Sequence, residues 1–362
     1  MLTRRAALLT ILVAASSAAQ PQKTKNIIFV MTDGLRWQEV FNGADETLMT
    51  KENGVSDVPG LRKAYWRDTP EARRAALMPF LWSVISKRGQ IYGNRNQGSD
   101  AHVTNGLNFS YPGYNETLCG FADPNIKSND KILNPNVTVL EWLNNKPAYR
   151  GKVAAFGAWD VFPYIFNGAR AGFLVNAGYD PLTSLRGNTR VDVLNQLRAE
   201  GPRVWSDEVF DPILFHTALE YLKESKPRVL YISLGETDDW AHEGKYALYL
   251  DAAHRADAHL KTLWDTVQAM PGYRDQTTLI FSPDHGRGDG PIGWKSHGQK
   301  IPESRYIWMA FLGPDTHALG ERSHSPAVTQ NQIAATLAAL LGEDYSNAVS
   351  KAGAPISDVL RH

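Results

Sequence analysis

The fold is decided by the stretch at residues 229–242, which reads VLYISLGETDDWAH. Its first half is a short run of β-branched and aromatic residues, which predicts a buried strand. Its second half places the carboxylate of Asp238 and the imidazole of His242 four residues apart, just beyond the carboxyl end of that strand. Open α/β sheets bind their ligands at that end of their strands. The stretch therefore predicts one half of a metal site in an α/β protein.

Strands and helices are expected to alternate along the rest of the chain. Residues 26–31 (NIIFVM) are apolar without alternation, as in a central parallel strand that is buried on both faces. Other runs are apolar or have a helical period; they predict strands at 152–157, 278–282 and 306–312 and helices at 137–143, 209–223, 249–267 and 328–341. This alternation favours an α/β fold with a largely parallel central sheet and helices on both faces.

Two segments lack such a pattern. Residues 42–74 are polar and irregular, and we expect a surface excursion there. Residues 159–203 mix aromatic residues with Gly and Asn without a clean period, which predicts an inserted cap or lid. Because elaborated α/β domains often exceed 300 residues, we expect a single domain over residues 20–362 that carries this cap.

Composition excludes few functions. The 362 residues contain 38 Lys+Arg and 38 Asp+Glu, so the chain shows no overall basic signal for nucleic-acid binding. Cys119 is the single cysteine, so no internal disulfide can form. A metal would therefore be held mainly by oxygen and nitrogen ligands.

The N-terminus resembles a targeting segment. Arg4 and Arg5 precede an apolar run at 6–15, and the small residues Ser17 and Ala19 suit cleavage before residue 20. We expect residues 1–19 to be a signal peptide, because the apolar run is too short to cross a bilayer. The mature protein is then expected to be periplasmic or secreted, with no membrane span after signal removal.

Metal-ligand residues follow several predicted strands. Besides the pair at residues 238 and 242, Asp33 precedes a glycine after the first strand, Asp284 and His285 follow 278–282, and His297 comes thirteen residues after Asp284. Each residue alone has an ordinary explanation, as a turn, a helix cap or a surface histidine. Together they supply about six ligands, as many as two divalent ions roughly 4 Å apart require. A mixed Asp/His set suits zinc best, with manganese or iron as alternatives.

A nucleophile is expected in the sequence NFSYPGY at residues 108–114. The hydroxyl of Ser110 lies in a loop before a predicted helix, where a metal can lower its pKa and helix N-terminal amides favour an anion. A serine in such a loop is ordinarily only a helix cap. Thr104, in the nearby VTNG sequence, is a rival nucleophile.

The ordered motifs resemble the alkaline phosphatase superfamily, and within it the type I phosphodiesterase/nucleotide pyrophosphatase branch. The resemblance covers about residues 26–342 and rests on the motifs DG at 33–34, SYP at 110–112, DDWAH at 238–242, SPDHG at 282–286 and HG at 297–298. Three departures are Cys119 for a threonine, Ala241 for a glycine, and one inserted residue in SPDHG.

The resemblance implies a three-layer alkaline-phosphatase-like fold and two divalent metal ions, one held by Asp238, His242 and His297 and the other by Asp33, Asp284, His285 and the oxygen of Ser110. Ser110 is preferred over Thr104, because only Ser110 is followed by an aromatic residue and proline. An asparagine that contacts the phosphoryl oxygen is implied about twenty residues later, at Asn125 or Asn129. The implied activity is hydrolysis of small-molecule phosphate esters, as a phosphodiesterase or phosphatase, through a covalent phosphoserine.

Three alternatives are kept. A sulfatase-like enzyme is less favoured, because Tyr114 stands where that branch needs an arginine. A phosphoglycerate-mutase-like enzyme fits the metal site but not an exported protein. A non-catalytic, metal-containing binding protein would be expected to lose ligands or the nucleophile, and none is visibly lost.

Trp159 and Phe162 are expected either to shape a leaving-group pocket or to be core aromatics. Substrate, monoester or diester preference and oligomeric state stay open.

Overall fold

The computed structural model describes residues 22–361. The predicted signal peptide at 1–19 and the two residues that follow it lie outside this range. Every helix between residues 22 and 361 is too short or too polar to span a bilayer.

The centre of the protein is an eight-stranded sheet with the strand order β5-β4-β6-β1-β7-β8-β2-β9. Five neighbouring strands are parallel, namely β5 (Leu174–Ala177), β4 (Val153–Gly157), β6 (Val229–Leu234), β1 (Asn26–Thr32) and β7 (Thr277–Pro283). Strand β8 (Met309–Leu312) runs antiparallel to β7 and to β2 (Gln90–Tyr92), and β9 (Gly320–Glu321) pairs with β2 in parallel. A separate two-stranded sheet joins β3 (Ala101–His102) and β10 (Val328–Thr329). The predicted largely parallel sheet is confirmed.

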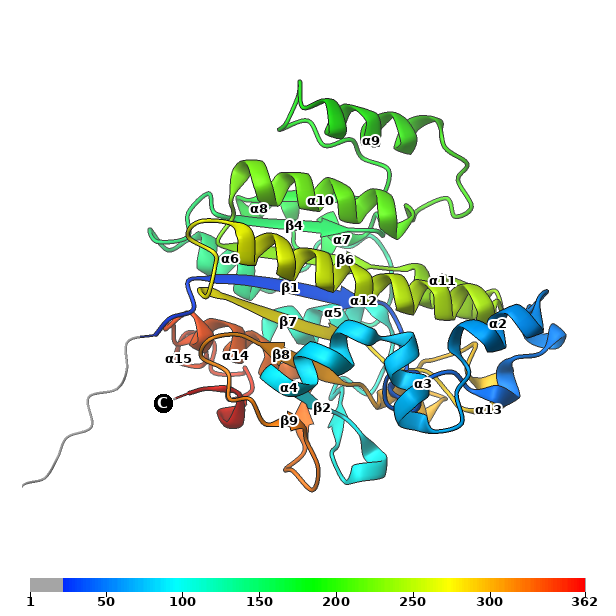
Figure 1. Cartoon of the computed structure of the whole chain (residues 1–362). Helices are drawn as coiled ribbons and strands as arrows, with labels where there is room; N and C mark the ends of the chain where they lie inside the picture. Colours follow the sequence, from blue (N-terminus) through cyan, green and yellow to red (C-terminus); the bar gives the residue numbers. More distant parts are fainter. Residues whose placement is uncertain (1–21, 362) are drawn as a thin grey trace, which may run out of the picture.

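Helices cover both faces of the sheet, as Figure 1 shows. One face is covered by α1 (Trp37–Asn42), α2 (Val58–Tyr65), α3 (Pro70–Leu77), α10 (Asp211–Ser225), α11 (Glu236–His242) and α12 (Tyr246–Ala269). The other is covered by α5 (Ser110–Cys119), α6 (Val139–Asn144), α7 (Phe162–Ile165), α14 (Ile333–Leu340) and α15 (Tyr345–Ala348). Three further short helices are α4 (Ser86–Arg88), α8 (Gly168–Ala171) and α13 (Gly290–Gly293).

Strand β1 explains why its sequence does not alternate. Ile28 and Val30 contribute to the core beneath α10 and α12, whereas Ile27, Phe29 and Met31 contribute to the core beneath α5 and α14. All five side chains are at most 1% exposed. Since burying one such side chain stabilises the fold by about 1.5–3 kcal/mol, both faces of this strand hold the layers together.

The expectation that residues 42–74 are irregular is wrong. The side chain of Asp57 accepts a hydrogen bond from the amide of Gly60, and that of Thr69 accepts one from the amide of Ala72. Each cap is followed by a proline in the first turn, so α2 and α3 both begin with ordinary helix-start signals. These helices are only eight residues long, too short for a clear apolar period to stand out.

Residues 159–203, expected to form a cap, fold in two parts. The first part contains α7, α8 and β5, and β5 is the edge strand next to β4. The second part contains α9 (Thr189–Glu200), which lies outside the layers beyond α10 (Figure 1). The first part therefore belongs to the core architecture, and only the second extends away from it.

Strand register explains how distant residues come together. Thr32, the last residue of β1, lies opposite Leu234 on β6 and Pro283 on β7. Because the three strands are parallel, the loops that follow them leave the same edge of the sheet at the same level. These loops begin at Asp33, Gly235 and Asp284.

Candidate metal centre and nucleophile

The first group of candidate ligands consists of Asp33, Asp284 and His285. One potential ligand atom from each lies within 4.8 Å of the others, and all three side chains are buried. The Nε2 atom of His285 is 3.1 Å from Oδ1 of Asp33 and 3.5 Å from Oδ2 of Asp284. Its Nδ1 atom lies 2.8 Å from the carbonyl oxygen of Gly286, which can only accept a hydrogen bond. This contact places the proton of the neutral ring on Nδ1 and leaves the lone pair of Nε2 free for a metal.

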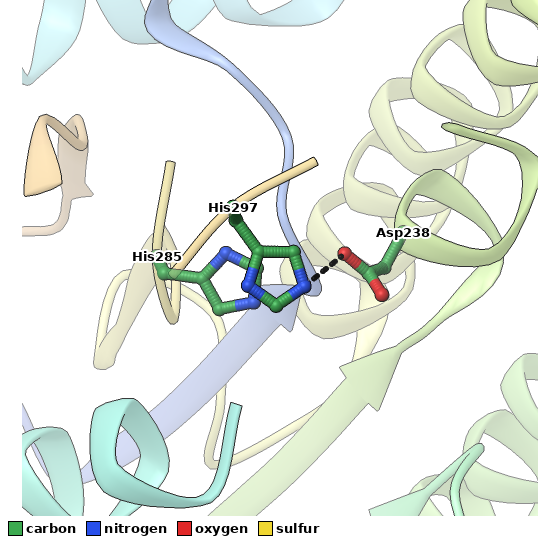
Figure 2. A group of neighbouring side chains, drawn as sticks. All are labelled: Asp238, His285 and His297. Carbon is green, nitrogen blue, oxygen red and sulfur yellow. Dashed lines mark ion pairs between the residues drawn. The ribbon is translucent and has the colours of Figure 1, made fainter. Parts of the chain in front are cut away.

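A second group lies directly beside the first and contains Asp238, His297 and His285 (Figure 2). The Nε2 atom of His297 is 3.6 Å from Oδ1 of Asp238, and the rings of His285 and His297 stack with centroids 4.0 Å apart. His242 joins this group, because its Nε2 is 3.1 Å from Oδ2 of Asp238 and 2.9 Å from Nε2 of His297. The four-residue spacing in α11 brings residues 238 and 242 to one face of that helix. All six predicted ligands therefore gather in one cluster.

Buried carboxylate oxygens show that the cluster fits a cation. Oδ1 of Asp33 and Oδ2 of Asp284 are buried and have no hydrogen-bond partner among the described residues. Burial, together with the neighbouring charge of Asp33, raises the pKa of Asp284 well above its usual range. A divalent cation would remove this repulsion and provide both oxygens with a partner, so the residues present fit a metal ion.

The pKa values of His285 and His297 are shifted in opposite directions. Burial lowers the pKa of His285, but the carboxylates of Asp284 and Asp33 outweigh burial and raise that pKa to about 9. Burial and the neighbouring His285 hold the pKa of His297 well below its usual range. In the absence of a metal, a positive charge on His285 thus compensates the carboxylates of Asp33 and Asp284.

Ser110 is the first residue of α5, and its Oγ lies 3.4 Å from Nε2 of His285. The side chain is 5% exposed. Asn108, two residues earlier, has the left-handed φ of 55° and its carbonyl oxygen lies 3.2 Å from Nδ1 of His297. Gly113 allows α5 to approach the end of β7, since a Cβ there would lie 2.4 Å from the carbonyl oxygen of Asp284.

Thr104, the rival nucleophile, has a different role in the fold. Its hydroxyl donates to Oε1 of Glu116 at 2.9 Å, and its amide donates to the same carboxylate. Glu116 also accepts from the amide and side chain of Asn105, so it organises the loop before α5. This arrangement favours Ser110 as the nucleophile, because only Ser110 faces the ligand cluster.

The two asparagines that the sequence could not separate occupy different places. Asn129 accepts a hydrogen bond through Oδ1 from the amide of Tyr111, at the start of α5 beside Ser110. Asn125 instead donates through Nδ2 to Asp123 in an exposed turn. Asn129 is therefore the asparagine beside Ser110, the candidate nucleophile.

Sequence reasoning missed Arg287. Its side chain is fully buried, and Nη1 contacts Oδ1 of Asp238. Nε donates to the carbonyl oxygen of Trp294 at 2.9 Å, and Nη2 donates to that of Lys295 at 2.6 Å. Burial opposes ionisation of Asp238, but Arg287 and the neighbouring histidines hold the pKa of that carboxyl well below its usual range. The available signal was an arginine two residues after His285 in the same loop.

Trp159 and Phe162, expected either to shape a leaving-group pocket or to be core aromatics, have different surroundings. Phe162 is 1% exposed, and its ring packs edge-on against Tyr114 with centroids 4.8 Å apart. Trp159 donates through Nε1 to Asp207 at 3.1 Å. Of the two interpretations offered for Phe162, the structure supports a core aromatic.

Comparisons with known proteins agree with this arrangement at the level of the fold. No family model matches the chain. Curated relatives include a 2,3-bisphosphoglycerate-independent phosphoglycerate mutase of Haloarcula marismortui, 25% identical over 149 residues, which are 41% of this chain and 27% of the relative. Another is GPI ethanolamine phosphate transferase 1 of Yarrowia lipolytica, 23% identical over 267 residues, which are 67% of this chain and 27% of the relative. The chain thus spans about a quarter of the length of these curated relatives.

Solved structures resemble nearly the whole chain. The alkaline phosphatase PafA aligns with a TM-score of 0.59 at 10% identity and covers 95% of this chain and 100% of its own. The lipoteichoic acid synthase LtaP from Listeria monocytogenes aligns with a TM-score of 0.57 at 15% identity, and the alignment covers 89% of this chain and 73% of the LtaP chain. At such identities the likeness establishes the fold alone, and the predicted alkaline-phosphatase-like fold is confirmed.

Proposed function

We propose that this chain, with its alkaline-phosphatase fold, is a two-metal hydrolase of small-molecule phosphate esters that uses Ser110 as its nucleophile. One observation carries the proposal: Oγ of Ser110 lies 3.4 Å from Nε2 of His285, in a cluster where one buried carboxylate oxygen of Asp33 and one of Asp284 have no hydrogen-bond partner in the described residues. A hydroxyl beside an Asp/His cluster is the arrangement that phosphoryl transfer to a serine needs.

The proposed ligand sets follow the positions of the side chains. Asp33, Asp284 and His285 would hold one ion next to Ser110, and Asp238, His242 and His297 would hold the other. Zinc suits these ligands best, and manganese is the alternative. When bound, two such ions supply positive charge that lowers the pKa of a serine hydroxyl and stabilises the attacking and leaving oxygens.

The chain's own residues would bind and orient the ester. Oγ of Ser110 forms the new bond to phosphorus as the bond from phosphorus to the leaving alcohol breaks in line. The backbone amides at the start of α5 favour the negative phosphoryl oxygens, and Asn129 stands beside them. Water then cleaves the phosphoserine, which releases phosphate or a phosphate monoester and restores the hydroxyl.

A cavity beside the nucleophile loop offers a place for the leaving group. It has a volume of about 400 Å³ and is bounded by the loop before Ser110 and the loop after His297; its wall includes His102, Thr104, Asn108, Gln299 and Arg305. We propose this cavity as the leaving-group pocket, in place of a pocket lined by Phe162. If a leaving group with an acidic substituent binds there, Arg305→Ala should raise KM for such a substrate and leave kcat nearly unchanged.

The test compares Ser110→Ala with Thr104→Val. Turnover of bis(p-nitrophenyl) phosphate, p-nitrophenyl phosphate and an aryl sulfate is measured before and after chelation, with metal content determined for each variant. We expect phosphate ester turnover to disappear in Ser110→Ala and to persist in Thr104→Val. Full activity of Ser110→Ala with normal metal content would refute the mechanism. Turnover of none of the three esters by a metal-loaded wild type would favour a non-catalytic binding protein, and preference for the aryl sulfate would favour a sulfatase.

Export is also proposed, on the signal-peptide pattern at residues 1–19. Expression of the full chain in a bacterium with two membranes, followed by fractionation and N-terminal sequencing, tests it. Release of a periplasmic or secreted protein that begins near residue 20 is expected. Uncleaved protein in the cytoplasm would contradict export without affecting the proposed chemistry.

A further inference from the structure

The hydroxyl of Tyr114 contacts Asp33, one of the candidate metal ligands. Tyr114 lies four residues after Ser110 in α5 and is 1% exposed. Its hydroxyl donates to Oδ2 of Asp33 at 2.9 Å and accepts a hydrogen bond from Oγ of Ser233 at 3.0 Å. Ser233 lies in β6, opposite Met31 in β1, so this chain of hydrogen bonds connects two neighbouring strands to the nucleophile helix.

Packing fixes the ring of Tyr114. The ring meets Phe162 edge-on, with an interplanar angle of 67°. Phe162 in turn lies against Gly157 at the end of β4, where an added Cβ would come within 2.0 Å of the phenylalanine ring. Because the aromatic side chains are held in this way, the hydroxyl has little freedom to leave Asp33.

The two carboxylate oxygens of Asp33 consequently have different surroundings. Oδ2 is occupied by the tyrosine hydroxyl, whereas Oδ1 faces Nε2 of His285 at 3.1 Å and has no hydrogen-bond partner within residues 22–361. We propose that Tyr114 is a positioning residue, which fixes the carboxylate of Asp33 so that Oδ1 alone faces the cation shared with Asp284 and His285. This inference rests on the proposed metal site. It gives a role to the residue that stands where a sulfatase would need an arginine.

Tyr111 provides a matched control on the same helix. It is also a buried tyrosine, 2% exposed, but its hydroxyl donates to the carbonyl oxygens of Ile132 and Tyr164. Tyr114→Phe and Tyr111→Phe each remove one buried hydroxyl that makes two hydrogen bonds. We therefore expect both variants to lose comparable thermal stability as metal-free proteins.

Metal retention separates positioning from mere stability. Each variant is loaded with Zn²⁺ and dialysed against increasing chelator, and the retained metal is measured by mass spectrometry. Loss of a residue that orients a metal ligand typically weakens affinity by about 10–100-fold. We expect this loss for Tyr114→Phe and not for Tyr111→Phe. In the Co²⁺-substituted protein, the visible absorption bands should change in Tyr114→Phe alone, because the coordination by Asp33 changes.

Equal zinc affinity and equal cobalt spectra in the two variants would overturn the inference. If Tyr114→Phe fails to fold, the double variant Phe162→Leu/Ser233→Ala decides, because it removes both the ring that packs against Tyr114 and the donor to the tyrosine hydroxyl. Zinc affinity equal to that of the wild type would then refute the positioning role, and a weaker affinity would support it. Since metal retention is measured without substrate, these results stay distinct from a failure of the wild type to hydrolyse phosphate esters.

Discussion

Replacing Arg287 with methionine should strongly destabilise the metal-free protein. Arg287 is fully buried, and its removal leaves the carboxylate of Asp238 without its nearest cation. Removal of one partner of a buried ion pair lowers the free energy of unfolding by about 3–5 kcal/mol. Because the Asp238 side chain is 16% exposed, the lower end of that range applies. The carbonyl oxygens of Trp294 and Lys295 also lose their donors, which adds roughly 1 kcal/mol or more. The expected loss is about 4 kcal/mol, a large share of a typical domain's stability.

The assay is urea unfolding, followed by tryptophan fluorescence, with and without a chelator. Bound metal would take over the compensation of the charge on Asp238, so the difference between Arg287→Met and the wild type should shrink when metal is present. Arg62→Met is the control, because Arg62 pairs with Glu46 at the surface, where a salt bridge contributes only about 0–1 kcal/mol. A loss below about 1 kcal/mol in metal-free Arg287→Met, equal to that of the control, would refute this account of Asp238.

Three further outcomes are expected. Gly113→Ala should lower kcat about 100-fold, because the added Cβ would clash with the backbone of Asp284 and displace α5 by a fraction of an ångström or more. An unchanged kcat would contradict the close approach of α5 to Asp284. His259 is buried against Phe215, and burial lowers its pKa to about 3, so the stability of its neutral form is present above pH 6.5 and is lost as the pH falls towards 3. Between pH 7.5 and 5.5 the free energy of unfolding of the metal-free wild type should therefore fall by about 1.4 kcal/mol more than that of His259→Phe. A control substitution at the exposed His317 should behave as the wild type. The same pH dependence of the unfolding free energy in wild type and His259→Phe, measured by urea unfolding, would count against this account. Chelation should abolish ester hydrolysis and lower Tm, and Zn²⁺ or Mn²⁺ should restore both; activity that survives complete metal removal would exclude a metal-dependent reaction.

The sequence predicted the parts of the fold that depend on local pattern. Strands β1, β6 and β7 and helix α12 occur close to their expected positions, because long apolar runs and helical periods reflect burial directly. The alternation of strands and helices predicted a largely parallel sheet, but not which strand departs from it, since an apolar run has the same pattern in either strand direction. The apolar run at 306–312 predicted a strand, which is β8, but only the structure shows that β8 is antiparallel to β7.

The sequence predicted which candidate residues lie together, but not the contacts that support them. Asp33, Asp238 and His285 follow strands, and parallel strands bring such residues to one edge. Arg287 escaped notice, because nothing in an arginine's local sequence reveals that its guanidinium is buried against a carboxylate. The choice between Asn125 and Asn129 likewise depended on a tertiary contact to the start of α5, which spacing cannot supply.

The position of the site in the chain has a consequence for biosynthesis. Gly34 and Asp284, whose amide and carboxylate are hydrogen-bonded in the cluster, are 250 residues apart in the sequence. A ribosome therefore makes Asp33 long before its partners exist, and non-local contacts of this kind form late in folding. If the cluster holds metal as proposed, the growing chain cannot capture it. The cofactor must be acquired by an essentially completed polypeptide, in whichever compartment that polypeptide finishes folding.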